Sequence, residues 1–463
     1  MTLALAFRNL LRNRRRSLAT LLAIAIGVAA VLLFGGYSSN IKYTLQTTYV
    51  RNGGHLQIQH RDFFLFGSGN PTAFGIVEYE KVLSAVIKDE VMKGLLFDAA
   101  PTLQFGAIAG NYAAAVSRTV IGTGLLAPAH SRMQEWNGFD VPLVSPPSGL
   151  DGSPDDSVVL GTGVARVLQM CGALNIANCP QRQEERAADG AAVPDDIAQL
   201  SRQEARAEPS ASVGSRRIEL LASTAGGTPN VASLQVVRAQ TQSFKELDEI
   251  AVITHLAQAQ RLVYGRAPHR ATSIVLQLHR TDQIEAAQMR LAALLPALAL
   301  SQPLSVLDFA TLNPYYVQTI QLFDTIFGFI FLLIGGIVLF NVSNTMNTAV
   351  VERTVEIGTL RAIGMRRGGI RRLFVLEGLL LGLAGSLVGV TSAIAIAFVV
   401  NRVGLTWLPP GVVDAVPLEL RVWSEPSTMF GTSVGLVLIA TLSACWPAHR
   451  AARMVVVDAL RHV

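Results

Sequence analysis

The side chains best suited to polar chemistry lie in one short segment, residues 350–374, between two long apolar runs. The segment contains two glutamates and six arginines, interleaved with valine, isoleucine and leucine. Carboxylates and guanidinium groups at this density make ion pairs and charge-assisted hydrogen bonds. Two interpretations are open: a short amphipathic helix that docks on another protein, or a solvated connector whose arginines contact anionic lipid.

The rest of the sequence lacks several common catalytic motifs. It has no phosphate-binding loop of the form G-x-x-x-x-G-K-[ST], no H-E-x-x-H motif and no C-x-x-C motif. His55 and His60 are five residues apart, on opposite faces of a predicted strand, so we expect surface histidines rather than metal ligands. We therefore expect a chain with neither a catalytic site nor a metal site.

The three cysteines fall into two settings. Cys171 and Cys179 are eight residues apart, and in an oxidising compartment we expect them to form a disulfide that closes a short loop. Two buried thiols are the alternative. Cys445 lies within an apolar run and is expected to be a small packing residue.

The polar segment must be positioned by the apolar runs around it. Half of all residues are hydrophobic and only 15% are charged, against roughly 25% in soluble proteins. Four runs reach the length of about 20 helical residues that crosses the hydrocarbon core. The sequence therefore predicts an integral membrane protein with four transmembrane α-helices, at residues 17–41, 317–349, 377–401 and 426–448, the second with an extension outside the membrane.

Arginines mark one side of these spans. They precede the first span, separate the second from the third and follow the fourth, whereas residues 402–425 carry few. By the positive-inside rule, both termini and residues 350–376 are cytoplasmic. Residues 1–16 predict an amphipathic entry helix at the membrane surface, and residues 449–463 a cytoplasmic tail. A cleaved signal peptide is disfavoured because the first apolar run is too long, and we expect no nucleic-acid partner.

Residues 42–316 are polar and mixed in composition, and this topology puts them outside the cytoplasm. Alternation in Gly54–His60 and the apolar run Ala271–His279 predict strands. Two further segments each predict a strand followed by a helix: Asp156–Met170 and Leu247–Val263. The result is a large extracytoplasmic α+β domain of two lobes. Residues 181–217 have almost no large apolar side chain and are predicted to form a mobile loop.

The spans contain small and polar residues suited to helix packing. Three G-x-x-x-G pairs would let helices approach closely: Gly378 with Gly382, Gly385 with Gly389, and Gly431 with Gly435. Asn341 and Asn344 are three residues apart near the inner end of the second span, and we expect them to hydrogen-bond to a neighbouring helix. A dimer interface and the lining of a cavity are alternatives. Because the apolar runs are uncharged, an ion-coupled transporter is disfavoured.

The segment NTMNTAVVERTVEIGTLRAIGMRRGGIRRLFVLEGLLLGLAGSLVG, from Asn344 to Gly389, resembles the signature of the FtsX/MacB-like (type VII) ABC transporter permeases. The family's motif Glu-Arg-x-x-Glu-Ile-Gly-x-Leu-Arg-Ala-Ile-Gly is matched from Glu352 to Gly364. Residues Ala6–Ala29 are similar to the family's entry helix and first span. Residues Pro447–Arg461 are similar to its tail, except for Val457, where a proline is frequent.

The resemblance implies a dimer of permease chains, either a homodimer or a heterodimer, above two copies of a cytoplasmic ABC ATPase. The MacB branch carries its ATPase before the entry helix. Because this chain begins at that helix, we expect a stand-alone permease that resembles the LolC/LolE branch. No cofactor is expected in this chain, since ATP and magnesium would bind to the partner ATPase. The family transmits ATP-driven movement through its spans to the external domains, a mode called mechanotransmission.

The resemblance also implies that residues 350–376 are the coupling helix and loop that contact the ATPase. Aliphatic side chains would lie in a groove of the ATPase: Val351, Val355, Ile357 and Leu360. Charged side chains would fix the register by hydrogen bonds: Glu352, Arg353, Glu356 and Arg361. Two glycines, Gly358 and Gly364, would allow close approach and helix exit.

The implied cargo is a lipoprotein, a lipid or another amphiphile, exported from a bacterial inner membrane. Membrane lipid and a periplasmic adaptor or lipoprotein are further expected partners. The alternative is a signalling permease that activates a periplasmic partner such as a cell-wall hydrolase. A membrane-anchored external domain without any ATPase is a third hypothesis.

Overall fold

The computed structural model describes residues 2–12, 14–67, 69–142, 149–176, 179, 216–242, 244–408, 415–423 and 425–455. It divides into two compact units. The helical unit contains residues 1–44, 315–407 and 416–463, and the large domain contains residues 45–314 and 408–415. Residues 181–215, which are most of the predicted mobile loop 181–217, lie outside the described part of the chain.

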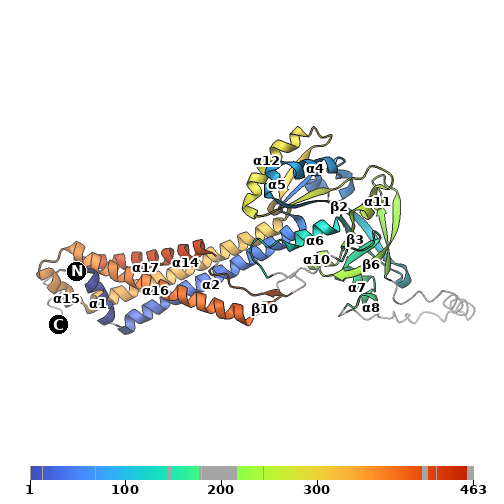
Figure 1. The fold of residues 1–463 in the computed structure, drawn as a ribbon. Coiled ribbons are helices and arrows are strands. Elements are labelled where there is room, and N and C mark those ends of the chain that lie inside the picture. Colours follow the sequence, from blue (N-terminus) through green and yellow to red (C-terminus); the bar gives the residue numbers. More distant parts are fainter. Residues whose placement is uncertain are drawn as a thin grey trace, which may run out of the picture. The chain divides into compact units, whose positions relative to one another are not determined.

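Six helices lie largely within the helical unit (Figure 1). They are α1 (Thr2–Arg12), α2 (Arg14–Gly53), α14 (Pro314–Glu352), α15 (Thr354–Ala362), α16 (Arg367–Val403) and α17 (Pro426–Arg453). Among the described residues, α2, α14, α16 and α17 are long and apolar enough to cross a membrane. The prediction of four transmembrane helices is therefore confirmed. At 40 residues, α2 is about 60 Å long, so it extends beyond the apolar run that the sequence marked.

One hydrophobic core holds these helices together, and glycines of α16 pack closely against α17 and α2. A Cβ added at Gly378 would lie 2.6 Å from Cβ of Ala444 on α17, and one at Gly389 would lie 2.6 Å from Cβ of Val28 on α2. The two G-x-x-x-G pairs of α16 therefore face different helices, with Gly382 on the α17 side and Gly385 on the α2 side.

In the third glycine pair, on α17, only one member packs against another helix of the described chain. A Cβ at Gly435 would lie 2.8 Å from the ring of Phe331 on α14, whereas one at Gly431 would have no atom within 4 Å. Gly431 therefore makes no close helix contact within the described chain. Cys445 is also exposed on α17 rather than packed in the core, because it lies on the outer face of the helix.

The link between α16 and α17 contains a short hairpin. Strands β10 (Thr406–Trp407) and β11 (Val416–Pro417) are antiparallel. Beyond β11, the backbone N–H of Leu420 donates to Oδ1 of Asn401 at 2.9 Å. The N–H of Arg421 donates to the carbonyl of Gly36 on α2 at 3.2 Å, so this link is held against the first span.

The large domain contains one nine-stranded sheet, in the order β3-β7-β4-β6-β5-β2-β8-β1-β9, with an additional pairing of β2 with β3. The strands are β1 (Leu56–His60), β2 (Leu96–Asn111), β3 (Val116–Leu125), β4 (Ser157–Gly161), β5 (Arg217–Ser223), β6 (Pro229–Gln240), β7 (Ala251–His255), β8 (Ser273–Leu278) and β9 (Leu304–Asp308). The additional pairing closes six strands, β2-β3-β7-β4-β6-β5, into a ring. Such a ring leaves none of its strands as a free edge.

The sixteen-residue strand β2 joins two lobes. Its first part, to Thr102, pairs with β8, and its second part, from Leu103, pairs with β3. Separate hydrophobic cores lie on the two parts: one around Phe105 and Leu160 in the ring, the other around Ile58 and Leu276 in the four-stranded part. The two-lobed α+β prediction is confirmed by these two cores, and so are the strand–helix orders at β4 and β7.

Short helices cover both lobes (Figure 1). The four-stranded lobe carries α3 (Phe63–Phe66), α4 (Tyr79–Lys88), α5 (Glu90–Leu95), α12 (Ile284–Ala297) and α13 (Phe309–Leu312). The others are α6 (Ala127–Glu135), α7 (Thr162–Val167), α8 (Cys171–Leu174), α10 (Lys245–Asp248) and α11 (Leu256–Tyr264). Cys171 and Cys179 are joined in a disulfide, with their Cα atoms 6.2 Å apart.

The expectation that His55 is a surface residue is wrong. It lies in the turn before β1 and is fully buried. Its Nδ1 accepts the N–H of Leu278 at 3.0 Å, so Nε2 carries the proton and donates to Oγ1 of Thr281 at 3.2 Å. The ring stands edge-on to Trp136. Burial lowers the pKa of His55 to about 3, because the charged form is poorly solvated there.

Candidate functional site

The charged segment 350–374 contains a helix break that its sequence does not predict. Helix α14 continues to Glu352, and α15 begins at Thr354, so Arg353 lies at a break between them. The hydroxyl of Thr354 donates to the carbonyls of Val350 and Val351, at 3.2 and 2.8 Å, and satisfies the groups that the break exposes. Helix α15 ends at Ala362, and Gly364 follows with a φ of +102°, which a residue with a side chain rarely adopts.

After the break, some of the predicted docking residues face the helical core. Ile357 is buried in the helical core, and Leu360 packs against the same core. Gly358 is buried beside them. Ile357 is therefore used within the chain, and the expectation that it contacts a partner is wrong. Leu360 is half-buried, and its contact with a partner stays a prediction.

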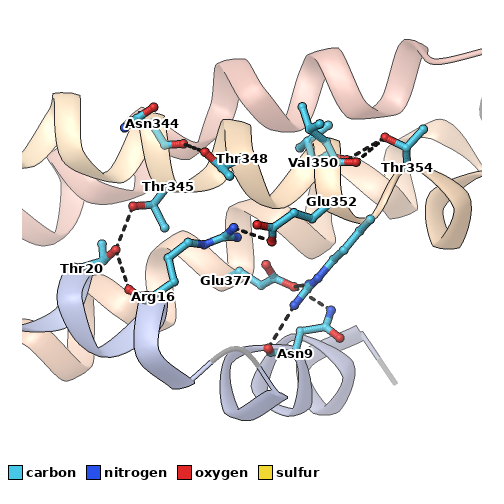
Figure 2. A network of polar contacts seen from close by, with 12 residues as sticks. Asn9, Arg16, Thr20, Asn344, Thr345, Thr348, Val350, Glu352, Thr354 and Glu377 are labelled. Carbon is cyan, nitrogen blue, oxygen red and sulfur yellow. Dashed lines mark hydrogen bonds and ion pairs between the residues drawn. The ribbon is translucent and has the colours of Figure 1, made fainter. Parts of the chain in front are cut away.

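Arg353 makes the most deeply buried ion pair of the helical unit. Its Nη1 donates to Oε1 of Glu377 on α16 at 3.1 Å, and the two side chains are only 7% and 3% exposed. Its Nη2 donates to the backbone carbonyl of Asn9 on α1 at 3.0 Å, and Nδ2 of Asn9 donates to Glu377 at 2.7 Å. We call Asn9, Arg353 and Glu377 the buried triad; Figure 2 shows Asn9 and Glu377 facing each other.

The buried triad corrects two expectations. Arg353 was expected to bind a partner, but its hydrogen bonds are used within the chain. The spans were also expected to be uncharged, but Glu377 is the first residue of the predicted third span. Ionisable groups at such positions usually have a function. Removing one partner of a buried pair leaves an uncompensated charge, which costs about 3–5 kcal/mol.

Beside the buried triad, α1 and α2 face α14 and α15 through a line of polar contacts. Arg12 pairs with Glu356, and Arg16 pairs with Glu352 at 2.7 Å. One turn further along α2, Oγ1 of Thr20 lies 2.9 Å from Oγ1 of Thr345. We call these three contacts the polar ladder; Figure 2 shows the latter two. From the sequence alone, these arginines indicated only how the spans are oriented in the membrane.

Arg361 is also used within the chain. Its Nη1 donates to the carbonyls of Ala452 and Met454, at 3.2 and 2.9 Å. These carbonyls belong to the end of α17, where helix carbonyls have no partner within the helix and favour a positive charge. Arg361 therefore joins α15 to α17; its side chain is half-buried, and its contact with a partner stays a prediction.

What remains for a partner is a narrow apolar face. Val351, Val355 and Ile363 are 66%, 46% and 81% exposed. Thr359 is exposed as well, so Val355, Thr359 and Ile363 follow each other at four-residue spacing along α15 and its C-cap, and Val351 is exposed just before the break. Glu352 and Glu356 border this face with half-exposed carboxylates that Arg16 and Arg12 hold. We call Val351, Val355, Thr359 and Ile363 the outward face.

Another surface lies on α14 itself. A shallow groove of about 540 Å³ is lined by Leu333, Gly336, Ile337, Phe340, Asn341 and Asn344. Asn344 is exposed and Asn341 half-buried. Within the part of the chain that the structure describes, neither amide side chain has a hydrogen-bond partner, so the predicted bond to a neighbouring helix is not made by this chain. An amide without a partner is costly in hydrocarbon.

Among the described residues, no three His, Cys, Asp or Glu side chains lie close enough together to bind a metal ion.

Four residues of the site were not predicted from the sequence: Asn9, Arg12, Arg16 and Glu377. A signal for two of them existed: Arg12 and Arg16, together with Thr20, recur every four residues, which predicts one polar line along a helix.

Comparison with known proteins finds a family match for part of the chain. Residues 325–456 match the model of the FtsX-like permease C-terminal family. LolC of Xylella fastidiosa (strain 9a5c), a lipoprotein-releasing system transmembrane protein, is 26% identical over 266 residues, which are 54% of this chain and 61% of LolC. MacB of Escherichia coli O157:H7, a macrolide export ATP-binding/permease protein, is 36% identical over 143 residues, 31% of this chain and 20% of MacB.

The chain thus spans less than two thirds of the length of these relatives. Among solved structures, the extracellular domain of the noncanonical ABC-type transporter YknZ from Gram-positive bacteria aligns with 55% of this chain and 99% of that domain. Its TM-score of 0.28 and sequence identity of 10% are too low to establish a shared fold. The family match thus assigns an FtsX-like permease C-terminal region to residues 325–456, which contain α15, α16, α17 and most of α14.

Proposed function

We propose that this chain is the membrane subunit of an ABC transporter and that a separate ATPase docks on the outward face. The main observation behind this proposal is a contrast in side-chain exposure along one short segment. Arg353, Ile357 and Arg361 are all used within the chain, whereas Val351, Val355 and Ile363 are left exposed. Aliphatic side chains in a helical row on a polar surface are typical of a helix that lies in a groove of another protein.

The proposed topology puts the outward face in the cytoplasm, with both termini, in a bacterial inner membrane. Arginines are concentrated at this end of the helices. The disulfide between Cys171 and Cys179 fits an oxidising compartment for the large domain. Helix α1 has Leu3, Phe7 and Leu11 exposed along one side, as expected for a helix that lies on the lipid surface. ATP and magnesium would be bound by the ATPase.

A second permease chain is part of the proposal. The groove on α14 carries two amides without a partner in the described chain, next to Gly336, where a neighbouring helix can approach closely. Amide hydrogen bonds to a second chain, identical or homologous, would satisfy them. The assembly would then contain two permease chains and two ATPase subunits.

The proposed work is mechanotransmission: displacement of α15 by the ATPase moves the long helices and, through them, the large domain. The cargo we propose is a lipoprotein, a lipid or another amphiphile, because one relative belongs to a lipoprotein-releasing system and another exports macrolides. A periplasmic adaptor or lipoprotein would be the external partner. The second candidate is a signalling permease whose large domain activates a periplasmic protein such as a cell-wall hydrolase.

Affinity purification in mild detergent tests the docking proposal. The wild-type chain is expected to recover a P-loop ATPase, and the double substitution Val355→Asp and Ile363→Asp to lose it. Met289→Asp is the matched control, because Met289 is 65% exposed on α12 of the large domain. Recovery of the ATPase by the double variant at the wild-type level would refute docking on this face. An external protein that co-purifies and is activated by ATP, without movement of any amphiphile, would favour the signalling candidate.

A further inference from the structure

The break at Arg353 poses a mechanical problem for the proposed function. Along the chain, helix α15 is joined to α14 by this break and to α16 by residues 363–366, and Ile357 packs it on the helical core. If the break were free, a push on α15 would tilt it against α14 and α16. The displacement would then be lost before it reached the long helices.

The buried triad restrains the break from two sides. Arg353 is held by the carbonyl of Asn9 on α1 and by the carboxylate of Glu377 on α16. Asn9 and Glu377 are also bonded to each other, so three helices meet at one closed set of hydrogen bonds. Any rotation at Arg353 must break bonds that are shielded from water, where they are strong.

The polar ladder extends this restraint along the helices. Contacts from Arg12, Arg16 and Thr20 run in one direction along α1 and α2, and their partners Glu356, Glu352 and Thr345 run in the opposite direction along α15 and α14. A slide of α1 and α2 along α15 and α14 by one residue would misalign all three contacts. The ladder therefore opposes sliding, while the triad opposes rotation.

From this geometry we infer that α1 and α15 form one rigid coupling unit, in which Arg12 and Arg16 are positioning residues: Arg12 holds α1 to α15, and Arg16 holds α2 to the end of α14. The inference rests on the proposed function for its purpose. The rigidity itself is a property of the permease and can be measured without an ATPase. On this inference, α1 belongs to the part of the permease that the ATPase displaces, and it is not only an anchor at the membrane.

The first test measures distances in the purified permease alone. Nitroxide labels at Arg8→Cys and Thr359→Cys, both exposed, report on the spacing of α1 and α15 in a Cys445→Ser background. Pulsed electron paramagnetic resonance should give one narrow distance distribution. Arg12→Gln with Arg16→Gln should roughly double its width, because the ladder is lost and the helices fluctuate independently.

Two controls separate the ladder from general effects of charge. Arg14→Gln with Arg15→Gln removes the same charge from exposed neighbours and should leave the distribution narrow. Arg16→Glu should broaden it, and Arg16→Glu combined with Glu352→Arg should restore it, because the swapped pair can form again. A narrow distribution in Arg12→Gln with Arg16→Gln, or a swap that does not restore it, would overturn the inference.

The second test asks whether the unit stays rigid during the ATP cycle. Thr20→Cys with Thr345→Cys places two sulfurs where hydroxyls lie 2.9 Å apart, and oxidation should join them. In complex with the ATPase that co-purifies, the oxidised permease should support ATP hydrolysis at the wild-type rate. A severalfold loss of hydrolysis that a reductant reverses would mean that the helices slide, and would overturn the inference. If no ATPase co-purifies, the proposed function fails, while the distance measurement still decides the rigidity.

Discussion

The guanidinium group of Arg353 lies 3.1 Å from the carboxylate of Glu377, and the two side chains are almost completely buried between α1, α15 and α16. This pair lies at the only break between α14 and α15, next to the face that we propose for an ATPase. The charged segment is therefore divided by function. Its inner residues fix the segment to the helices, and its outer residues are free to contact a partner.

Removal of one member of this pair should be strongly destabilising. Glu377→Ala leaves a buried guanidinium without its carboxylate, which should lower the free energy of unfolding by about 3–5 kcal/mol. The double variant Arg353→Met with Glu377→Leu should recover most of this loss, because no buried charge remains. Thermal unfolding in detergent, followed by intrinsic fluorescence, measures both. Equal stability of the wild type and Glu377→Ala would contradict the assigned pair.

Two aliphatic residues of α15 should respond in opposite ways to truncation. Ile357→Ala creates a cavity in the helical core and should cost about 2–5 kcal/mol of unfolding free energy. Val355→Ala should change stability by less than about 0.5 kcal/mol, because the side chain is exposed, but should weaken ATPase binding. Unfolding curves and pull-down yields measured on the same preparations distinguish the two roles. A stable Ile357→Ala variant with weakened ATPase binding would reverse our assignment.

Glycines that look alike in sequence should differ in their tolerance of a side chain. Gly378→Ala should destabilise the helical unit, because the new Cβ would lie 2.6 Å from that of Ala444. Gly431→Ala should be neutral or slightly stabilising, since nothing lies near it and alanine favours helix by up to about 1 kcal/mol. Melting temperatures in one detergent test the pair. A larger loss at Gly431 than at Gly378 would indicate that another chain packs on α17.

Burial of His55 predicts a loss of stability in mild acid. Its pKa of about 3 in the folded chain lies below the value near 6.5 of an unfolded histidine. The unfolded chain therefore binds the proton more readily. Stability from this residue is complete above about pH 6.5 and is lost as the pH falls towards 3, by a few kcal/mol in total. His130, whose pKa is lowered to about 4 by burial, acts in the same direction.

Melting temperatures between pH 7.5 and pH 4.5 measure this effect, a range chosen to bracket the unperturbed histidine value of about 6.5. His55→Gln should flatten the fall that the wild type shows, while the matched control His60→Gln, in the half-buried strand β1, should keep it. An unchanged slope in His55→Gln would show that protonation of this ring does not limit folding.

Local patterns were enough to predict the four long helices and strands β1, β4, β7 and β8, but not β2, β3, β5, β6 or β9. Uncharged apolar runs marked α2, α14, α16 and α17, and alternation followed by helical spacing marked β4 with α7 and β7 with α11. These features depend on residues that are close in sequence. The six-stranded ring was not predicted, because it depends on which strands pair across long separations.

The site was predicted less completely, for the same reason. The motif from Glu352 to Gly364 was located, but its inward and outward residues were not separated, because the break at Arg353 changes the direction of the side chains that follow. Asn9 and Glu377 are 368 residues apart, and no local pattern connects them. His55 was taken for a surface residue because the turn before β1, rather than the strand, sets its burial.

Photo-crosslinking within the intact membrane tests the central claim most directly. With p-benzoylphenylalanine at Ile363, on the outward face, illumination should produce a crosslink to a P-loop ATPase. The same group at Ile357, buried in the helical core, should produce none. Crosslinks to the ATPase from both positions, or from Ile357 alone, would contradict the division of this segment. So would a crosslink from Ile363 to lipid alone while an ATPase is bound elsewhere on the chain.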